Sequence, residues 1–173
     1  MIYFQSDNIT IRDMKQEDSE ILHNETLAQG CHSEIGLYEK YYSEQEQHIR
    51  YVFVAEYNGN IAGYTTMLPH ATKGPFAEQG LPEIVDFNVL AKYRRRGIGT
   101  KILDVAESMA AKLDTRVSLG VGLHHGYGAA QRMYVKRGYI PDGSGVWYRD
   151  KCLEQYTNCC NDDDLVLYLS KEL

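Results

Sequence analysis

The hydrophobic positions mark one helix most clearly, in the stretch from about residue 98 to residue 112. Apolar side chains recur there at offsets of 0, 4, 7, 8, 11, 12 and 15 residues. This is the spacing of one face of an α-helix with about 3.6 residues per turn. The residues of this stripe are Ile98, Ile102, Val105, Ala106, Met109, Ala110 and Leu113. The pattern predicts an amphipathic helix that buries the stripe.

A β-hairpin is predicted over residues 51–68, where two runs rich in β-branched and aromatic residues flank Asn58-Gly59. Asn-Gly is favoured in two-residue hairpin turns because both positions need a positive φ. Apolar or alternating runs predict further strands at 9–14, 83–90, 116–123, 139–149 and 164–173. Helices are predicted at 16–29, 33–48 and 128–137, and a loop rich in proline and glycine at 69–82.

The predicted elements follow the order β-α-α-β-β-β-α-β-α-β-β. This order is typical of an α/β (α+β) protein with a mixed sheet and helices on its faces. A chain of 173 residues fits one domain, so we expect residues 1–173 to form a single unit.

Charge and cysteine content narrow the functional class. The net charge of −6 argues against nucleic-acid binding, which needs a positive surface. No zinc-type spacing surrounds Cys31, Cys152, Cys159 or Cys160, so we expect no metal and a reducing, cytoplasmic location. We also expect no signal peptide and no membrane span, because no apolar stretch reaches about 18 residues.

A cationic turn precedes the amphipathic helix and contrasts with the acidic chain. Arg94, Arg95 and Arg96 are followed by Gly97 and Gly99. A glycine turn at a helix N-terminus brings unpaired N–H groups and the positive end of the helix dipole close to an anion such as phosphate. The alternative is a solvated basic bend. The dinucleotide fingerprint lacks its third glycine here, and the P-loop pattern is absent.

These residues resemble the GCN5-related N-acetyltransferase (GNAT) superfamily, whose signature is [Q/R]-x-x-G-x-[G/A]; Arg94, Gly97 and Gly99 match it. A second block resembles the family's N-x-x-A-x-x-x-Y-x-x-x-G-[F/Y]. The residues in register are Ala130, Tyr134, Gly138 and Tyr139, whereas Tyr127 replaces the usual Asn. The resemblance extends over about residues 8–170. It implies the GNAT fold, a mixed, mostly antiparallel sheet of about seven strands.

The resemblance also implies acetyl-CoA as co-substrate, with no metal. The residues that would hold its pyrophosphate are Arg94, Arg95, Arg96, Gly97, Ile98, Gly99 and Thr100. Backbone groups of Val89 and Leu90 would pair with the pantetheine arm. Tyr127 puts one contact with the cofactor in doubt, because the Asn that it replaces often touches CoA.

The resemblance supplies candidates for the chemistry as well. Tyr134 would protonate the departing CoA thiolate. Glu83, eleven residues before Arg94, would be the general base. Three alternatives stay open for the base: Asp86, if a β-bulge changes the alternation of the strand, the pair His124-His125, and ordered water.

We therefore expect transfer of an acetyl group to a primary amine of a small molecule or peptide through a direct ternary complex. A catalytically inactive CoA-binding regulatory or interaction module is the alternative, and a nucleotide-binding domain is a third. The acidic chain and the run Asp162-Asp163-Asp164 favour a cationic acceptor. The tyrosines 38, 41 and 42 would either line the acceptor site or pack their helix. A homodimer is expected only by analogy with the superfamily.

Overall fold

A computed structural model describes residues 1–173. The chain divides into two compact units, the first formed by Met1–Leu68 and Val85–Met109 and the second by Pro69–Ile84 and Ala110–Leu173. Strand β5 and helix α3 each cross from one unit to the other. No helix has the length and apolar character needed to cross a membrane.

The first unit contains neighbouring hydrogen-bonded strands and three helices. Its strands are β1 (Ile2–Gln5), β2 (Ile9–Asp13), β3 (Tyr51–Tyr57), β4 (Asn60–Leu68) and most of β5 (Glu83–Val89), hydrogen-bonded in that order. Its helices are α1 (Asp18–Ala28), α2 (Leu37–Glu46) and α3 (Ile98–Ala110), with the short 3-10 turn η2 (Ala91–Tyr93) before α3. The pairs β1–β2, β2–β3 and β3–β4 are antiparallel.

The second unit holds the remaining elements. Its strands follow the order β5-β6-β9-β7-β8 and comprise β6 (Arg116–Gly122), β7 (Ile140–Tyr148), β8 (Lys151–Cys152) and β9 (Leu165–Glu172). Its helical segments are η1 (Gly74–Gln79), η3 (His125–Tyr127) and α4 (Gly128–Lys136). The β5–β6 pair is parallel, and the β6–β9, β7–β9 and β7–β8 pairs are antiparallel.

The predicted fold class is confirmed, but the strand count was too low. The structure has nine strands instead of about seven. The additional ones are the edge strands β1 and β8, which are four and two residues long and too short to show a pattern. The loop predicted at 69–82 contains the 3-10 turn η1.

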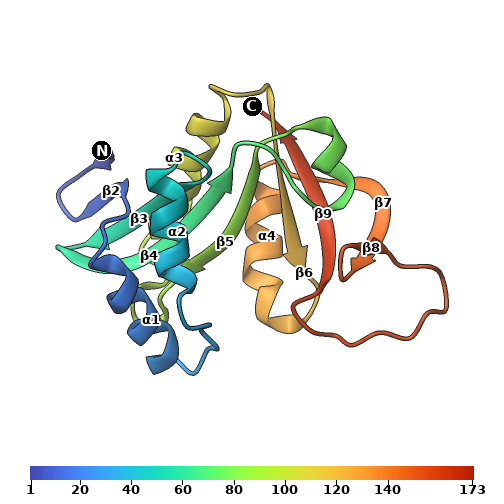
Figure 1. The fold of residues 1–173 in the computed structure, drawn as a ribbon, viewed down its shortest axis with the longest axis horizontal. Coiled ribbons are helices and arrows are strands. Elements are labelled where there is room, and N and C mark those ends of the chain that lie inside the picture. The colour runs from blue at the N-terminus through green and yellow to red at the C-terminus, as the bar shows by residue number, and fades with distance from the viewer. The chain divides into compact units, whose positions relative to one another are not determined.

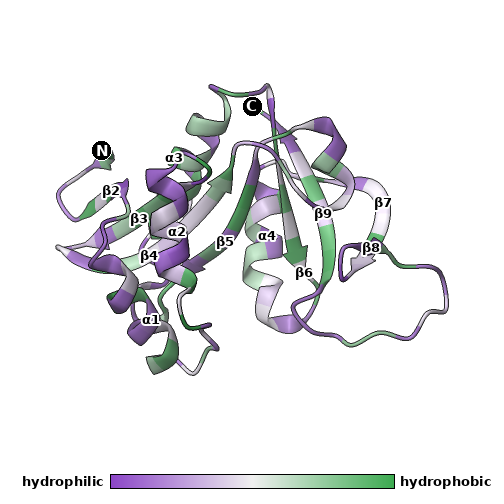
Figure 2. Ribbon diagram, viewed as in Figure 1, coloured by the Kyte–Doolittle hydropathy of each residue, from purple (hydrophilic) through white to green (hydrophobic).

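Helices cover both faces of the strands in the first unit. Helices α1 and α2 pack on β3 and β4 (Figure 1), where the Tyr38 ring lies 5.4 Å from the Tyr64 ring. Helix α3 packs on the opposite face. Gly63 is the neighbour of Tyr64 in β4 and faces the other side of the strand, where a Cβ on Gly63 would lie 3.4 Å from Cδ1 of Ile102. Figure 2 shows hydrophilic residues over most of α2, which buries only Tyr38 and Tyr41.

The predicted stripe on α3 is largely buried. Ile98, Ile102, Ala106 and Ala110 are at most 1% exposed. Leu113 is 44% exposed because the helix ends at Ala110, before the position at which this residue would rejoin the stripe.

The hairpin prediction is confirmed at its turn. Asn58 and Gly59 have φ values of 50° and 77°, the left-handed conformations for which this pair is favoured.

Candidate functional site

The turn between β5 and α3 has the backbone that its glycines predict. Arg95 and Gly97 have φ values of 62° and 78°. Gly99 is needed for close packing, since a Cβ there would lie 3.0 Å from the Phe87 ring and 3.3 Å from the Val89 side chain. Gly97 therefore permits the turn, whereas Gly99 lets the first turn of α3 approach β5.

The first turn of α3 presents unpaired backbone donors. The N–H of Lys101 donates to the carbonyl of Gly97 at 3.1 Å, which is the first bond of the helix. The N–H groups of Ile98, Gly99 and Thr100 precede this bond and have no acceptor within the protein. Together with the helix dipole they favour an anion, so the turn fits a pyrophosphate.

The three arginines of this turn differ in their surroundings, although all are exposed. Arg94 donates through Nε to the carbonyl of Val89 at 3.0 Å and so holds the turn against the end of β5. The Arg96 guanidinium lies over the Tyr57 ring, 5.0 Å from its centroid. Arg95 has no side-chain partner in the protein, which leaves all of its donors available to a ligand.

Backbone groups at the end of β5 are partly engaged. The N–H of Leu90 donates to the carbonyl of Ala62 at 2.9 Å, and the Leu90 side chain is buried. The Val89 carbonyl already accepts from Arg94. The expected pairing of Val89 and Leu90 with pantetheine stays a prediction. The Leu90 N–H is already engaged by its hydrogen bond to β4.

In the second unit, α4 positions Tyr134 in a buried environment. Its side chain is 5% exposed, and its ring lies 5.6 Å from that of Tyr139. Gly138, with φ of 91°, ends the helix, and the Tyr139 N–H donates back to the Tyr134 carbonyl at 3.1 Å. The Gly-Tyr pair of the second sequence block thus closes α4 and packs against Tyr134.

Burial raises the pKa of Tyr134, and the nearby Tyr127 adds to this effect. The phenol therefore stays protonated at neutral pH, as a proton donor must.

Tyr127 and His124 have structural partners. The Tyr127 hydroxyl and His124 Nε2 both donate to Oδ1 of Asp163 at 2.9 Å, and His124 Nδ1 accepts the Gly126 N–H at 3.1 Å. Because Nδ1 accepts, the proton of the neutral ring is on Nε2. Both ring nitrogens of His124 are thus occupied, which disfavours this residue as the base.

The acidic run is also partly engaged. Hydrogen bonds from His124 and then Tyr127 lower the pKa of Asp163. Asp162 accepts the Asp164 N–H at 3.1 Å and the Tyr148 hydroxyl at 3.3 Å. These contacts make the run an ordered turn before β9.

The two carboxylates predicted on β5 lie in different units. Glu83 is 8% exposed and opposite Ser118 of β6. Asp86 has φ of 55°, which supports a β-bulge at this position of β5. Its Oδ2 accepts hydrogen bonds from Tyr41 on α2 and Tyr64 on β4. Sequence reasoning missed Tyr64, since nothing in its strand pattern signals a carboxylate partner.

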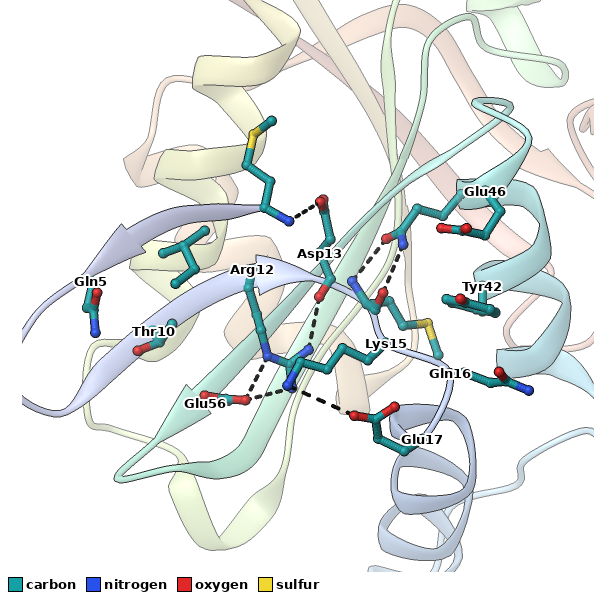
Figure 3. Close-up of a pocket in the computed structure, with 14 residues that line it drawn as sticks. Gln5, Thr10, Arg12, Asp13, Lys15, Gln16, Glu17, Tyr42, Glu46 and Glu56 are labelled. Atoms are coloured by element: carbon teal, nitrogen blue, oxygen red, sulfur yellow. Dashed lines mark hydrogen bonds and ion pairs between the residues drawn. The ribbon is translucent and has the colours of Figure 1, made fainter.

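A separate open pocket of about 750 Å³ lies beside β1, β2 and the end of α2 (Figure 3). Its central charge is Arg12, which is 8% exposed and bonds Asp18 at 2.6 Å and Glu56 at 2.7 Å. None of the residues predicted for cofactor or catalysis lines this pocket. Arg12 also donates to the Asp13 carbonyl at 2.9 Å, so its guanidinium is engaged by protein acceptors.

The sequence that contains the β5–α3 turn matches a known protein family. The model of the acetyltransferase (GNAT) family matches residues 15–139, which include both sequence blocks. The chain belongs to the GNAT acetyltransferase family. No curated protein has a significantly similar sequence.

Solved structures of acetyltransferases share the GNAT fold with this chain. One from Salmonella typhimurium, which modifies the N-terminal serine of ribosomal protein L7/L12, has a TM-score of 0.75 at 10% identity, covering 100% of this chain and 99% of its own. YncA from the same organism, with acetyl-CoA, has 0.66 at 16%, covering 96% and 94%. Arabidopsis thaliana Naa50, with the bisubstrate analogue CoA-Ac-MVNAL, has 0.64 at 18%, covering 96% and 99%.

Proposed function

We propose that this GNAT protein transfers the acetyl group of acetyl-CoA to a primary amine of a small molecule or peptide. The observation that carries the proposal is the first turn of α3, where the N–H groups of Ile98, Gly99 and Thr100 have no partner in the protein. Because this chain belongs to the GNAT family, we assign these donors and the exposed Arg95 to the pyrophosphate of acetyl-CoA.

The proposed binding roles follow the geometry of the first unit. Acetyl-CoA supplies a thioester, an acyl group activated for attack by an amine. The backbone from Gly97 to Thr100 would hold the pyrophosphate, and Arg95 would reach the outer phosphates. Arg94 and Arg96 keep the turn in shape through Val89 and Tyr57.

The proposed catalytic roles fall to two buried side chains. Tyr134 would donate its hydroxyl proton to the leaving sulfur, and its raised pKa keeps that proton in place until a thiolate forms. Glu83, which is largely buried at the start of β5, would accept a proton from the acceptor. His124 is the weaker alternative, because both of its nitrogens are bonded.

Two related structures point to one acceptor class among several. The Salmonella typhimurium enzyme modifies an N-terminal serine, and Naa50 is bound to the bisubstrate analogue CoA-Ac-MVNAL. Peptide amino ends therefore belong in any substrate panel beside polyamines and aminoglycosides. The single domain over 1–173 and the cytoplasmic location are part of the proposal. All four cysteines are free and exposed, which suits a reducing compartment.

Release of free thiol from acetyl-CoA tests the proposal. Wild type, Tyr134→Phe and the control Tyr156→Phe would be assayed against the amine panel; Tyr156 is 92% exposed in the loop before β9. We expect Tyr134→Phe to lower kcat at least about tenfold, equivalent to about 1.4 kcal/mol of barrier, and Tyr156→Phe to leave it unchanged.

Two other outcomes would change the conclusion. Acetyl-CoA binding without thiol release from any amine would identify a non-catalytic CoA-binding module. Failure of wild type to bind acetyl-CoA in calorimetry would refute the assignment of the β5–α3 turn.

A further inference from the structure

Asp86 is the only non-glycine residue in a strand that has a positive φ. Left-handed backbone is unfavourable for residues with a Cβ, although aspartate tolerates it better than most. Such a conformation persists only where the surrounding structure imposes it. The contacts around Asp86 therefore show what this bulge in β5 maintains.

The backbone beside the bulge is held by a chain of polar side chains. The carbonyl of Val85 accepts the Thr66 hydroxyl at 2.9 Å. Thr66 Oγ1 in turn accepts Nη1 of Arg50 at 2.7 Å, and Arg50 Nε donates to Glu44 at 2.6 Å. The carbonyl next to Asp86 is thus satisfied by a side chain. Arg50 forms its ion pair with Glu44, and its guanidinium lies 4.7 Å from the centroid of the Tyr41 ring.

The Asp86 carboxylate is fixed through one of its two oxygens. Oδ2 accepts the Tyr41 hydroxyl at 2.9 Å and the Tyr64 hydroxyl at 2.8 Å. The Tyr64 hydroxyl itself accepts from Tyr38 at 3.3 Å, and Tyr38 pairs with Thr26 at 2.9 Å. Burial, followed by the charge of Asp86, raises the pKa of both Tyr41 and Tyr64, so these hydroxyls remain donors at neutral pH.

The second oxygen of Asp86 is available to a ligand. Oδ1 has no hydrogen bond, no cation pairs with the carboxylate, and the residue is exposed. Two neutral phenols orient the negative charge without neutralising it. A ligand that completes the site must bring a positive charge and N–H donors, which an ammonium group does.

The place of Asp86 in β5 links this site to the proposed reaction. It stands three residues before Val89, roughly 10 Å along an extended strand, and so close to the β5–α3 turn in the first unit. We propose that Asp86, oriented by Tyr41 and Tyr64, binds an ammonium group of the acceptor and selects cationic amines. This inference rests on the proposed acetyl transfer and assigns to Asp86 a role distinct from that of Glu83.

Asp86→Asn is the informative variant, because asparagine keeps an oxygen that can accept both phenol hydrogen bonds while losing the charge. Asp7→Asn is the matched control, since Asp7 is exposed in the β1–β2 turn with no side-chain partner. Calorimetry would measure binding of spermidine, kanamycin and a serine-terminated tripeptide amide to each protein, with and without CoA. Acetyl-CoA binding would be measured separately.

We expect at least one probe to bind wild type and to bind Asp86→Asn at least about tenfold more weakly, with acetyl-CoA affinity unchanged and Asp7→Asn like wild type. Asp86→Glu should recover part of the affinity. Equal probe affinity for wild type and Asp86→Asn would overturn the ammonium site, as would the absence of binding by every probe. The thiol-release assay tests the proposed acetyl transfer. The calorimetric titration with amines tests the role of Asp86 separately, because it measures binding and requires no turnover.

Discussion

The close contact between β4 and β5 at Gly63 should make this position intolerant of any side chain. A Cβ on Gly63 would lie 2.6 Å from the carbonyl oxygen of Asn88 and 3.1 Å from Cα of Val89. Both atoms belong to the backbone of β5, so no side-chain rotation can relieve the overlap. Ordinary contacts between such atoms are roughly 3.5 Å, so β5 would have to move by about 0.9 Å to restore one.

We expect Gly63→Ala to lower the free energy of unfolding. Overpacking of this kind costs about 1–3 kcal/mol, and the lower backbone entropy of alanine in the unfolded chain offsets about 0.5–1 kcal/mol. The net loss is roughly 0–2.5 kcal/mol, and we expect the upper part, about 1–2.5 kcal/mol, because the overlap is with backbone atoms; this corresponds to about 2–10 °C in Tm for a chain of this size. Because the displaced residues adjoin the β5–α3 turn, acetyl-CoA should also bind more weakly.

Urea unfolding and calorimetric titration with acetyl-CoA would measure both effects. Gly128→Ala is the matched control: Gly128 has φ of −56° at the start of α4, and nothing lies within 4 Å of its added Cβ. There the same methyl group should be neutral or stabilising by up to about 1 kcal/mol. A Gly63→Ala protein as stable as wild type, with unchanged cofactor affinity, would refute the claim that strand contact requires glycine at this position.

Two further predictions concern charged groups. Arg12→Met should destabilise the protein by about 3–5 kcal/mol in urea unfolding, because Asp18, 1% exposed, would lose its cation and keep only the Lys15 N–H as donor; a loss below about 1 kcal/mol would contradict this. Asp163 has a lowered pKa, so its contribution is present above the unfolded value near 3.8 and is lost as pH falls through the folded value. Asp163→Asn should therefore be less stable than wild type at pH 7 by under about 1 kcal/mol, and the difference should shrink as pH falls below about 3.8; a difference that stays constant with pH would count against the pairing.

The local sequence was sufficient to predict each structural feature that depends on residues adjacent in the chain. The turn at Asn58-Gly59 and the start of α3 after Gly97 follow from conformations that these residues favour by themselves. The stripe on α3 follows from helical periodicity, because every third or fourth residue must share a face. The end of the stripe was less accurate, since Leu113 lies beyond the helix.

Contacts between residues far apart in the chain determined the features that the local sequence did not predict. The strands β1 and β8 are too short for a pattern and exist because a neighbour supplies hydrogen bonds. The sequence marked Asp86 only as one of several acidic candidates. Its left-handed backbone and its two phenol donors depend on Tyr41 and Tyr64, which lie 45 and 22 residues away in the chain. Sequence alone determines which groups can carry charge or donate a proton, and tertiary packing decides which of them are held together and left open to a ligand, because orientation and burial arise only from contacts between distant segments.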